Sequence, residues 1–154
     1  MEELVNRLIE LNKTISTMES CTGGGVANAI TNIEGASSIL KFSAVTYSNE
    51  YKIKMGVSKD VIDKYTVYSM ETANEMSKNI SMFSNSDYGV GITGQINRFD
   101  PANVVDNCNK IYISTYDREN DKFYERTITS IDDSRIKNKE MIIDDIKNML
   151  LEII

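Results

Sequence analysis

The sequence predicts an α/β protein, a three-layer α/β/α sandwich around a mixed β-sheet. Helical and β-prone segments alternate through most of the chain, and a Gly-rich turn joins an early strand to a helix. Near the end, two β-prone segments flank a short polar turn, which is typical of an antiparallel hairpin. A hairpin added to alternating elements gives a sheet with both parallel and antiparallel strands. With 154 residues, the chain has the size of one domain, so we expect residues 1–154 to form a single domain.

The first third of the chain predicts helices and strands in turn. Residues 2–12 place apolar side chains on one helical stripe, and residues 13–18 (KTISTM) are short and β-prone. After the glycines, VANAITNI (26–33) is typical of a helix, and residues 38–47 predict a second strand. Strand ends that lead into helix starts are the usual place for a ligand crevice in such folds.

The middle of the chain is mainly helical. Two short helical pieces are expected at 49–55 and 58–64, with a break at Gly56. A longer helix is expected over 69–83, because its apolar residues recur at helical spacing. These residues are Met70, Ala73, Met76, Ile80 and Phe83.

The last part of the chain predicts three strands and a helix. DYGVGIT (87–93) is typical of a short buried strand, and residues 95–109 form a polar loop. KIYISTY (110–116) and KFYERTITS (122–130) form the expected hairpin, and a helix runs from Ser134 to the end. The helices then cover both faces of the mixed sheet.

The composition excludes several functional classes. The formal net charge of −6 argues against non-specific binding to DNA, RNA or an anionic membrane, which needs a basic face. With no His and only Cys21 and Cys108, the chain holds no Ser-His-Asp triad, and we expect no metal and no cofactor. The acidic start lacks the features of a signal peptide, and no apolar run is long enough for a membrane span. We therefore expect a cytoplasmic protein.

The segment ESCTGG (19–24) stands between the first strand and the next helix. A helix N-terminus offers unpaired N–H groups and partial positive charge, so Ser20 could be a nucleophile held beside an anion site. Alternatively, Ser20 or Thr22 only caps the helix, and the glycines only form the turn. Cys21 could be the nucleophile instead, although we favour a buried, packed thiol at this position.

The segment YSNEYK (47–52) follows the second expected strand and opens a helix. Because the chain lacks His, a partly desolvated neutral Lys52 is the candidate base for a serine nucleophile. Tyr47 could relay a proton between the two groups. The alternatives are an ordinary surface lysine and a tyrosine at a strand end with a solvated hydroxyl.

Two further segments carry candidate ligand-binding residues. Thr93 ends the third expected strand, where its hydroxyl could bind a ligand or simply a local backbone group. Arg135 starts the last helix and could hold a phosphate with two hydrogen bonds, or lie free on the surface. Ser134, with the acids before it, is expected to cap that helix.

Taken in order, these segments resemble the C-terminal domain of the competence/damage-inducible protein CinA. Its Ala-Glu-Ser-Cys-Thr-Gly-Gly is similar to Met18–Gly24, and its Val-x-Tyr-Ser-Asn-Glu-x-Lys is similar to Val45–Lys52. Shorter matches follow in the family's order. They are Gly35-Ala36-Ser37, Gly56-Val57-Ser58, Thr93-Gly94 and, more loosely, Asp133-Ser134-Arg135.

The resemblance implies an amidohydrolase similar to nicotinamide-nucleotide amidase, which converts nicotinamide mononucleotide to nicotinic acid mononucleotide and ammonia without a metal. Ser20 would attack the carboxamide, Lys52 would transfer the proton, and Tyr47 would relay or orient it. The N–H groups around Thr22–Gly24 would stabilise the oxyanion. The implied substrate-binding residues are Thr22, Gly23, Gly24, Thr93, Gly94 and Arg135.

One departure from the family leaves alternatives open. Family members follow Thr-Gly with a Gly-rich loop, whereas here QINRFDPAN (95–103) follows, and no glycine occurs from Gln95 to Ser130. The chain could therefore be a catalytically inactive nucleotide- or protein-binding module, or a hydrolase of another amide. For both enzymatic alternatives the expected partner is a small-molecule substrate, and for the nicotinamide-nucleotide amidase this substrate is a nucleotide. The patterns leave homo-oligomer formation open.

Overall fold

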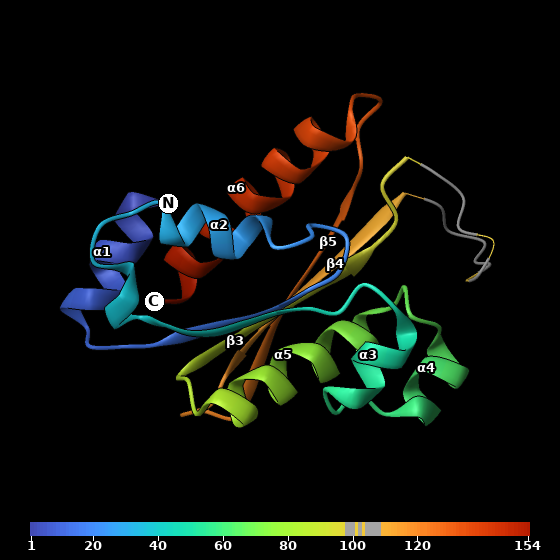
Figure 1. The fold of residues 1–154 in the computed structure, drawn as a ribbon, viewed down its shortest axis with the longest axis horizontal. Helices are drawn as coiled ribbons and strands as arrows, with labels where there is room; N and C mark the ends of the chain where they lie inside the picture. Colours follow the sequence, from blue (N-terminus) through green and yellow to red (C-terminus); the bar gives the residue numbers. More distant parts are fainter. Residues whose placement is uncertain (98–100, 102, 104–108) are drawn as a thin grey trace.

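The computed structural model describes residues 1–97, 101, 103 and 109–154, which fold into three layers (Figure 1). Among these residues, five strands form one sheet in the order β2-β1-β3-β4-β5. Strands β1, β2 and β3 are parallel, whereas β4 is antiparallel to β3 and to β5. The strands are β1 (Ile15–Glu19), β2 (Leu40–Val45), β3 (Tyr88–Gly94), β4 (Lys110–Asp117) and β5 (Lys122–Thr129). The expected mixed sheet is confirmed.

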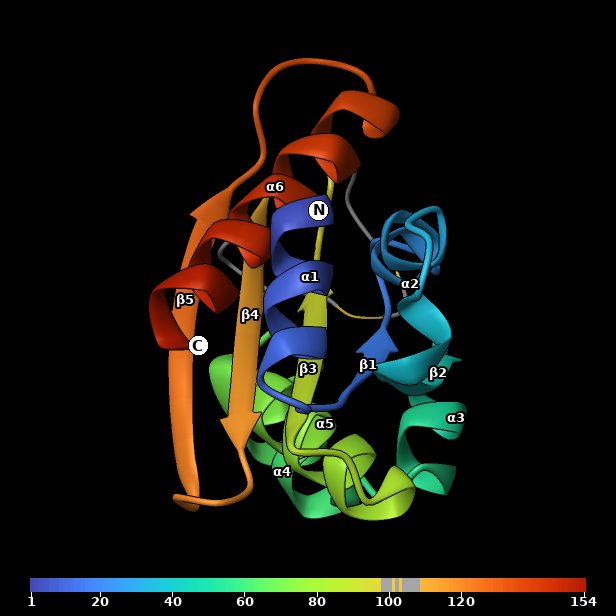
Figure 2. The ribbon, with the colours of Figure 1, turned by 90° about the vertical axis from the view of Figure 1, so that its left-hand side faces the viewer.

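Helices cover both faces of this sheet, as the α/β/α prediction required (Figures 1 and 2). One face carries α1 (Glu2–Glu10), α2 (Gly25–Thr31) and α6 (Arg135–Ile153). The other carries α3 (Asn49–Lys54), α4 (Lys59–Tyr65) and α5 (Met70–Ser84). A short 3₁₀ turn, Ala36–Ser38, precedes β2 and was not anticipated.

The burial of each strand follows from its place in the sheet. The central strands β1 and β3 are buried along their whole length, because helices cover both of their faces. The edge strands β2 and β5 instead contain exposed positions. The main apolar core lies between the sheet and the layer of α1, α2 and α6, where Leu8, Val26 and Ile146 are fully buried.

The other layer is held close to the sheet by two glycines of β3. A Cβ atom on Gly89 would lie 2.0 Å from the carbonyl oxygen of Ser77, and one on Gly91 would lie 2.3 Å from that of Ala73. Only glycine lets the backbones of α5 and β3 approach so closely. This contact fixes the position of β3, whose last residues reach the site described below.

The helix boundaries match their sequence signals closely. Ser134 caps α6 as expected, since its hydroxyl accepts the N–H of Lys137 at 3.2 Å. Ser48 and Ser69 cap α3 and α5 in the same way. Most of the expected polar loop 95–109 lies outside the described residues. None of the described helices is long and apolar enough to span a membrane.

Candidate active site

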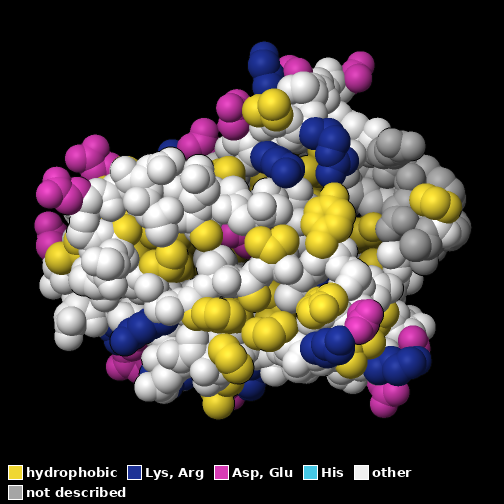
Figure 3. Space-filling model, viewed as in Figure 1, with side chains coloured by type: hydrophobic (Ala, Val, Ile, Leu, Met, Phe, Trp, Pro, Cys, Tyr) yellow, Lys and Arg dark blue, Asp and Glu magenta, His cyan; other side chains and the backbone are white. Residues whose placement is uncertain are grey.

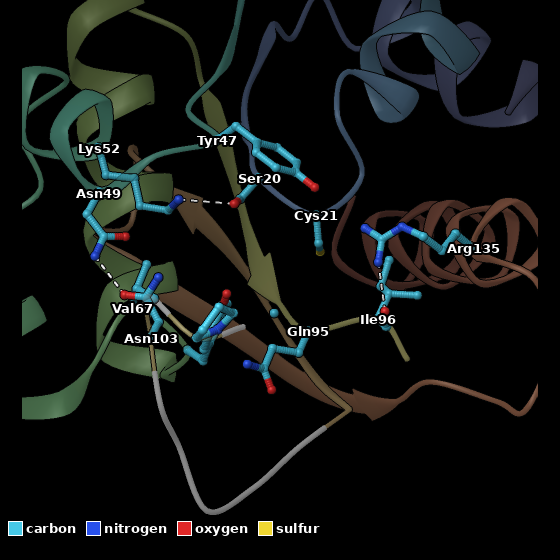
Figure 4. A pocket seen from close by; sticks show the side chains of 13 residues that line it. Ser20, Cys21, Tyr47, Asn49, Lys52, Val67, Gln95, Ile96, Asn103 and Arg135 are labelled. Carbon is cyan, nitrogen blue, oxygen red and sulfur yellow. Dashed lines mark hydrogen bonds between the residues drawn. The ribbon is translucent and has the colours of Figure 1, made fainter. Parts of the chain in front are cut away.

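A cavity of about 490 Å³ opens at the carboxyl ends of β1, β2 and β3, where segments far apart in the sequence converge (Figure 4). This is the edge at which parallel strands of an α/β sheet present ligand-binding residues. The lining residues described are Ser20, Cys21, Tyr47, Asn49, Lys52, Val67, Tyr68, Gly94, Gln95, Ile96, Pro101, Asn103 and Arg135.

The structure brings together Ser20 and Lys52. The Nζ atom of Lys52 donates a hydrogen bond to the Ser20 hydroxyl oxygen at 3.0 Å (Figure 4). It donates a second one to the carbonyl oxygen of Thr46 at 2.6 Å. The backbone N–H of Ser20 donates to Ile92 at 3.0 Å, which extends the pairing of β1 with β3 and fixes the serine. Ser20, which follows β1, and Lys52, which lies in α3, thus point toward each other at the carboxyl end of the sheet.

Burial changes the acid–base chemistry of this lysine. Lys52 is only 1% exposed, and among the described residues no carboxylate forms an ion pair with it. Loss of water penalises the charged amine, which lowers the pKa of Lys52 from 10.5 to about 8. At pH 7 about a tenth of the amine is therefore neutral, far more than for a lysine in water, and a neutral amine can accept the proton of Ser20.

Tyr47 lies at the mouth of the cavity. Its side chain is 65% exposed, and Figure 4 shows the ring beside Ser20 with the hydroxyl directed away from Lys52. No hydrogen bond joins the Tyr47 hydroxyl to either of these described side chains. The structure therefore places Tyr47 in the site without forming the proton relay that we considered.

The carboxylate of Glu19 organises the turn that carries Ser20, a role that the sequence analysis missed. Glu19 is fully buried and accepts hydrogen bonds from the Thr22 hydroxyl at 2.7 Å and from the N–H of Ala27 at 2.9 Å. It also accepts the N–H groups of Gly24 and Val26, both at 3.1 Å. The buried carboxylate of Glu19 thus caps the N-terminus of α2. An acid just before a helix start is the signal that could have revealed this role.

This capping restricts which backbone groups could bind an oxyanion. The N–H of Gly24 is bonded to Glu19, and that of Gly23 donates to the carbonyl of Ser20 at 3.0 Å. In the described part of the chain, the amides of Cys21 and Thr22 donate to no oxygen. Of these two residues only Cys21 lines the cavity, so its amide, rather than those of Thr22 and the glycines, is the candidate donor to a developing negative charge.

Cys21 lines the cavity but is 4% exposed. Burial raises the pKa of its thiol to about 12, which keeps the sulfur protonated at neutral pH. This environment supports the packing interpretation over a nucleophilic one. Cys108 lies outside the described residues.

The remaining expected binding residues divide into two groups. Gly94 and Arg135 line the cavity, and the Arg135 guanidinium donates to the carbonyl oxygen of Ile96 at 2.7 Å (Figure 4). Thr93 does not line it, because its fully buried hydroxyl donates to the carbonyl of Val67 at 2.8 Å. Thr22, Gly23 and Gly24 belong to the turn below the cavity and are not among its lining residues.

The cavity also contains polar residues that the sequence analysis did not single out. Asn49 donates from Nδ2 to Asn103 at 2.7 Å, and Gln95 lines the wall contributed by the end of β3 (Figure 4). Asn49 belongs to the segment YSNEYK, so the motif itself was the available signal. In the described residues, no group of three or more His, Cys, Asp or Glu side chains is placed to hold a metal ion.

The fold and the site define a class of protein, an α/β/α domain with a buried serine–lysine pair at the carboxyl ends of its parallel strands. The structure resembles a competence/damage inducible protein CihA from Agrobacterium tumefaciens with a TM-score of 0.88 and 27% identity. That match covers 98% of this chain and 93% of the other. A CinA superfamily protein from Klebsiella pneumoniae gives a TM-score of 0.89 at 18% identity, covering 98% and 92%, which shows the fold alone.

The sequence model of the CinA C-terminal domain matches residues 1–143, so the chain belongs to the CinA C-terminal domain family. Among curated relatives, a competence-damage inducible protein from Clostridium kluyveri is 48% identical over 96 residues, which are 61% of this chain and 23% of that protein. A CinA-like protein from Endomicrobium trichonymphae is 47% identical over 88 residues, which are 56% and 21% of the two chains. The matched part thus spans about a quarter of these relatives.

Proposed function

We propose that this protein is a metal-independent amidase that hydrolyses nicotinamide mononucleotide to nicotinic acid mononucleotide and ammonia. The observation that carries this proposal is the 3.0 Å contact between the buried amine of Lys52 and the hydroxyl of Ser20. A serine needs a base to become nucleophilic, and this amine is next to it with a lowered pKa. The family resemblance supplies the substrate, because nicotinamide-nucleotide amidases carry the same Ser, Tyr and Lys motifs.

The first half of the reaction uses the neutral form of Lys52. Its lone pair takes the proton of Ser20 as the serine oxygen bonds to the carboxamide carbon, which gives a tetrahedral oxyanion. The amide of Cys21, which lines the cavity, is the candidate donor to that oxyanion. The ammonium of Lys52 keeps its hydrogen bond to the Thr46 carbonyl, which orients it toward the reacting atoms.

The second half returns the site to its starting state. Lys52 gives its proton to the departing nitrogen, the C–N bond breaks, and ammonia leaves an ester on Ser20. A water molecule then loses a proton to Lys52 and attacks the ester, and the carboxylic acid is released as Ser20 regains its proton. The exposed ring of Tyr47 covers the mouth of the cavity and orients the substrate in this scheme.

An anionic substrate needs local positive charge in a protein with a net charge of −6. Arg135 lines the cavity, and Lys139 lies one helical turn further, where its Nζ would be 3.3 Å from a Cβ on Gly23. Figure 3 shows Lys and Arg side chains grouped near α2 and the first turns of α6. We assign the substrate phosphate to this group.

The decisive experiment is to incubate the purified protein with nicotinamide mononucleotide and to measure nicotinic acid mononucleotide and ammonia. We expect equal amounts of both products from the wild type, loss of more than about 1,000-fold in Ser20→Ala, and near-normal turnover in Cys21→Ala. Cys21→Ala is the matched control, because it alters the neighbouring side chain in the same turn.

Two results would overturn the proposal. Turnover that persists in Ser20→Ala assigns the chemistry to another group. A wild-type protein that binds the nucleotide without hydrolysing it is a binding module, in which Ser20 and Lys52 serve only the fold. Ligand binding measured on the same samples by calorimetry separates this second result from a misfolded preparation.

A further inference from the structure

The carboxamide of Gln95 differs from the other polar groups named in the cavity, because it is buried without a hydrogen-bond partner among the described residues. Gln95 is 4% exposed, and its Nε2 and Oε1 atoms are both buried. Neither atom has a hydrogen-bond partner in the part of the chain that the structure describes. The residue nevertheless lines the cavity that contains Ser20 and Lys52 (Figure 4).

The other polar groups named around Gln95 are already paired. The carboxamide of Asn49 donates to Asn103, and the carbonyl of Ile96 accepts from Arg135. The backbone of Gln95 is also held, since its N–H donates to the carbonyl of Lys110 at 3.1 Å and continues the ladder of β3 with β4. A fixed backbone thus keeps one unpaired donor and one unpaired acceptor in the cavity wall.

An unpaired buried amide is unfavourable for folding, so native proteins satisfy nearly all such groups. An apolar side chain of the same size would serve the fold better at this position. Unsatisfied groups of this kind occur where the partner is a ligand, and function then outweighs stability. The ligand that satisfies Gln95 must present an acceptor and a donor side by side.

We propose that Gln95 pairs with the primary carboxamide of the substrate through two hydrogen bonds. Nε2 donates to the substrate carbonyl oxygen, and Oε1 accepts from its amide nitrogen. This inference rests on the proposed function for the identity of the substrate. Since Glu19 of β1 pairs with Ile92 of β3, the chain after each strand delivers Ser20 and Gln95 to the same edge of the sheet.

This pairing makes Gln95 a specificity residue. The product carboxylate has no N–H group, so it leaves Oε1 of Gln95 facing an oxygen. A site built to hydrogen-bond a donor rejects an analogue that lacks it by large factors, because the buried partner is left unpaired. Gln95 therefore favours binding of the amide and release of the acid.

The first test compares affinities in the Ser20→Ala protein, which does not consume the ligand. We expect it to bind nicotinamide mononucleotide about 10- to 100-fold more tightly than nicotinic acid mononucleotide. Adding Gln95→Met, which has a similar size but no polar atoms, should reduce this ratio to within about threefold. Asn79→Leu is the matched control, since its carboxamide is not part of the cavity lining and donates to the carbonyl of Glu75, so the ratio should persist.

The second test measures the stability of Gln95→Met without ligand. Removing two unpaired polar atoms from a buried position should raise the melting temperature by about 2–4 °C. An unchanged or lower melting temperature means that Gln95 is satisfied within the free protein, which overturns the inference.

A third measurement separates this inference from the proposed function. Ligand-observed NMR with nicotinamide and benzamide needs neither a nucleotide nor turnover. Gln95-dependent binding of these carboxamides by a protein that does not hydrolyse the nucleotide supports the inference and overturns the proposed function. An unchanged amide-to-acid ratio in Gln95→Met, in a protein that does hydrolyse it, overturns the inference alone. The absence of any carboxamide binding also overturns it.

Discussion

At the scale of single residues, the burial of Lys52 predicts how the proposed amidase reaction should depend on pH. The reaction needs the neutral amine, so kcat/KM should rise with pH through an apparent pKa of about 8 and then level off. An unburied lysine would place this rise near pH 10.4. The measurement is a pH–rate profile with nicotinamide mononucleotide, with Cys21→Ala as the control because the pKa of its thiol is about 12. A profile that is flat from pH 6 to 9 would argue against Lys52 as the base.

The same lysine links stability to pH. Its pKa is about 8 in the folded protein and 10.5 when unfolded, so between these values the unfolded state binds the extra proton. The free energy of unfolding should therefore rise with pH from about 8 to 10.5. The gain relative to Lys52→Met is about 3 kcal/mol over that window. Urea denaturation of both proteins at several pH values measures it, and parallel curves for the two would mean that Lys52 is not desolvated.

At the scale of elements, the junction of β1 with α2 depends on Glu19. One carboxylate accepts the N–H groups of Gly24, Val26 and Ala27, so Glu19→Gln replaces one accepting oxygen by a donor and leaves buried amides unpaired. We expect a loss of about 1–3 kcal/mol in the free energy of unfolding. Chemical denaturation is the measurement, and the matched control is Glu50→Gln.

The control differs from Glu19 only in its surroundings. Glu50 is exposed and pairs with Lys54 on the surface of α3, so its replacement should change stability by less than about 0.5 kcal/mol. Equal effects of the two substitutions would show that the helix α2 does not depend on the buried carboxylate. A larger effect for Glu19 would explain why an acid precedes the serine in this turn.

The elements themselves could be predicted because their signals are local. Apolar periodicity and cap residues gave α1, α5 and α6 within a few residues, and the motifs placed Ser20 and Lys52 after parallel strands. The role of Glu19 had only a weak local signal, an acid before a helix start, because the role depends on burial of the turn against three amides. Likewise, the carboxamide of Gln95 is unpaired because no group of the neighbouring described segments forms a hydrogen bond with it. No local sequence pattern indicates such an absence.

At the scale of the whole molecule, the distribution of charge matters more than its sum. The net charge of −6 would repel the phosphorylated substrate of the proposed reaction at long range, whereas Arg135 lines the cavity and Lys139 lies next to the turn at Gly23. Lys139→Met should therefore raise KM for nicotinamide mononucleotide about three- to tenfold with little change in kcat, and leave KM for the riboside without phosphate unchanged. Lys147→Met, on the same helix but paired with Asp144, is the control.

The salt dependence of KM distinguishes a through-space electrostatic effect of Lys139 from a direct contact between Lys139 and the phosphate. The Debye length falls from about 30 Å at 0.01 M to about 3 Å at 1 M salt, so an effect that acts through space should fade as salt is added. We expect the KM difference between Lys139→Met and the wild type to shrink by at least half between these conditions. A difference that persists at high salt would mean that Lys139 contacts the phosphate directly. A difference shared by the riboside would place Lys139 in the fold of the turn at Gly23 rather than in substrate recognition.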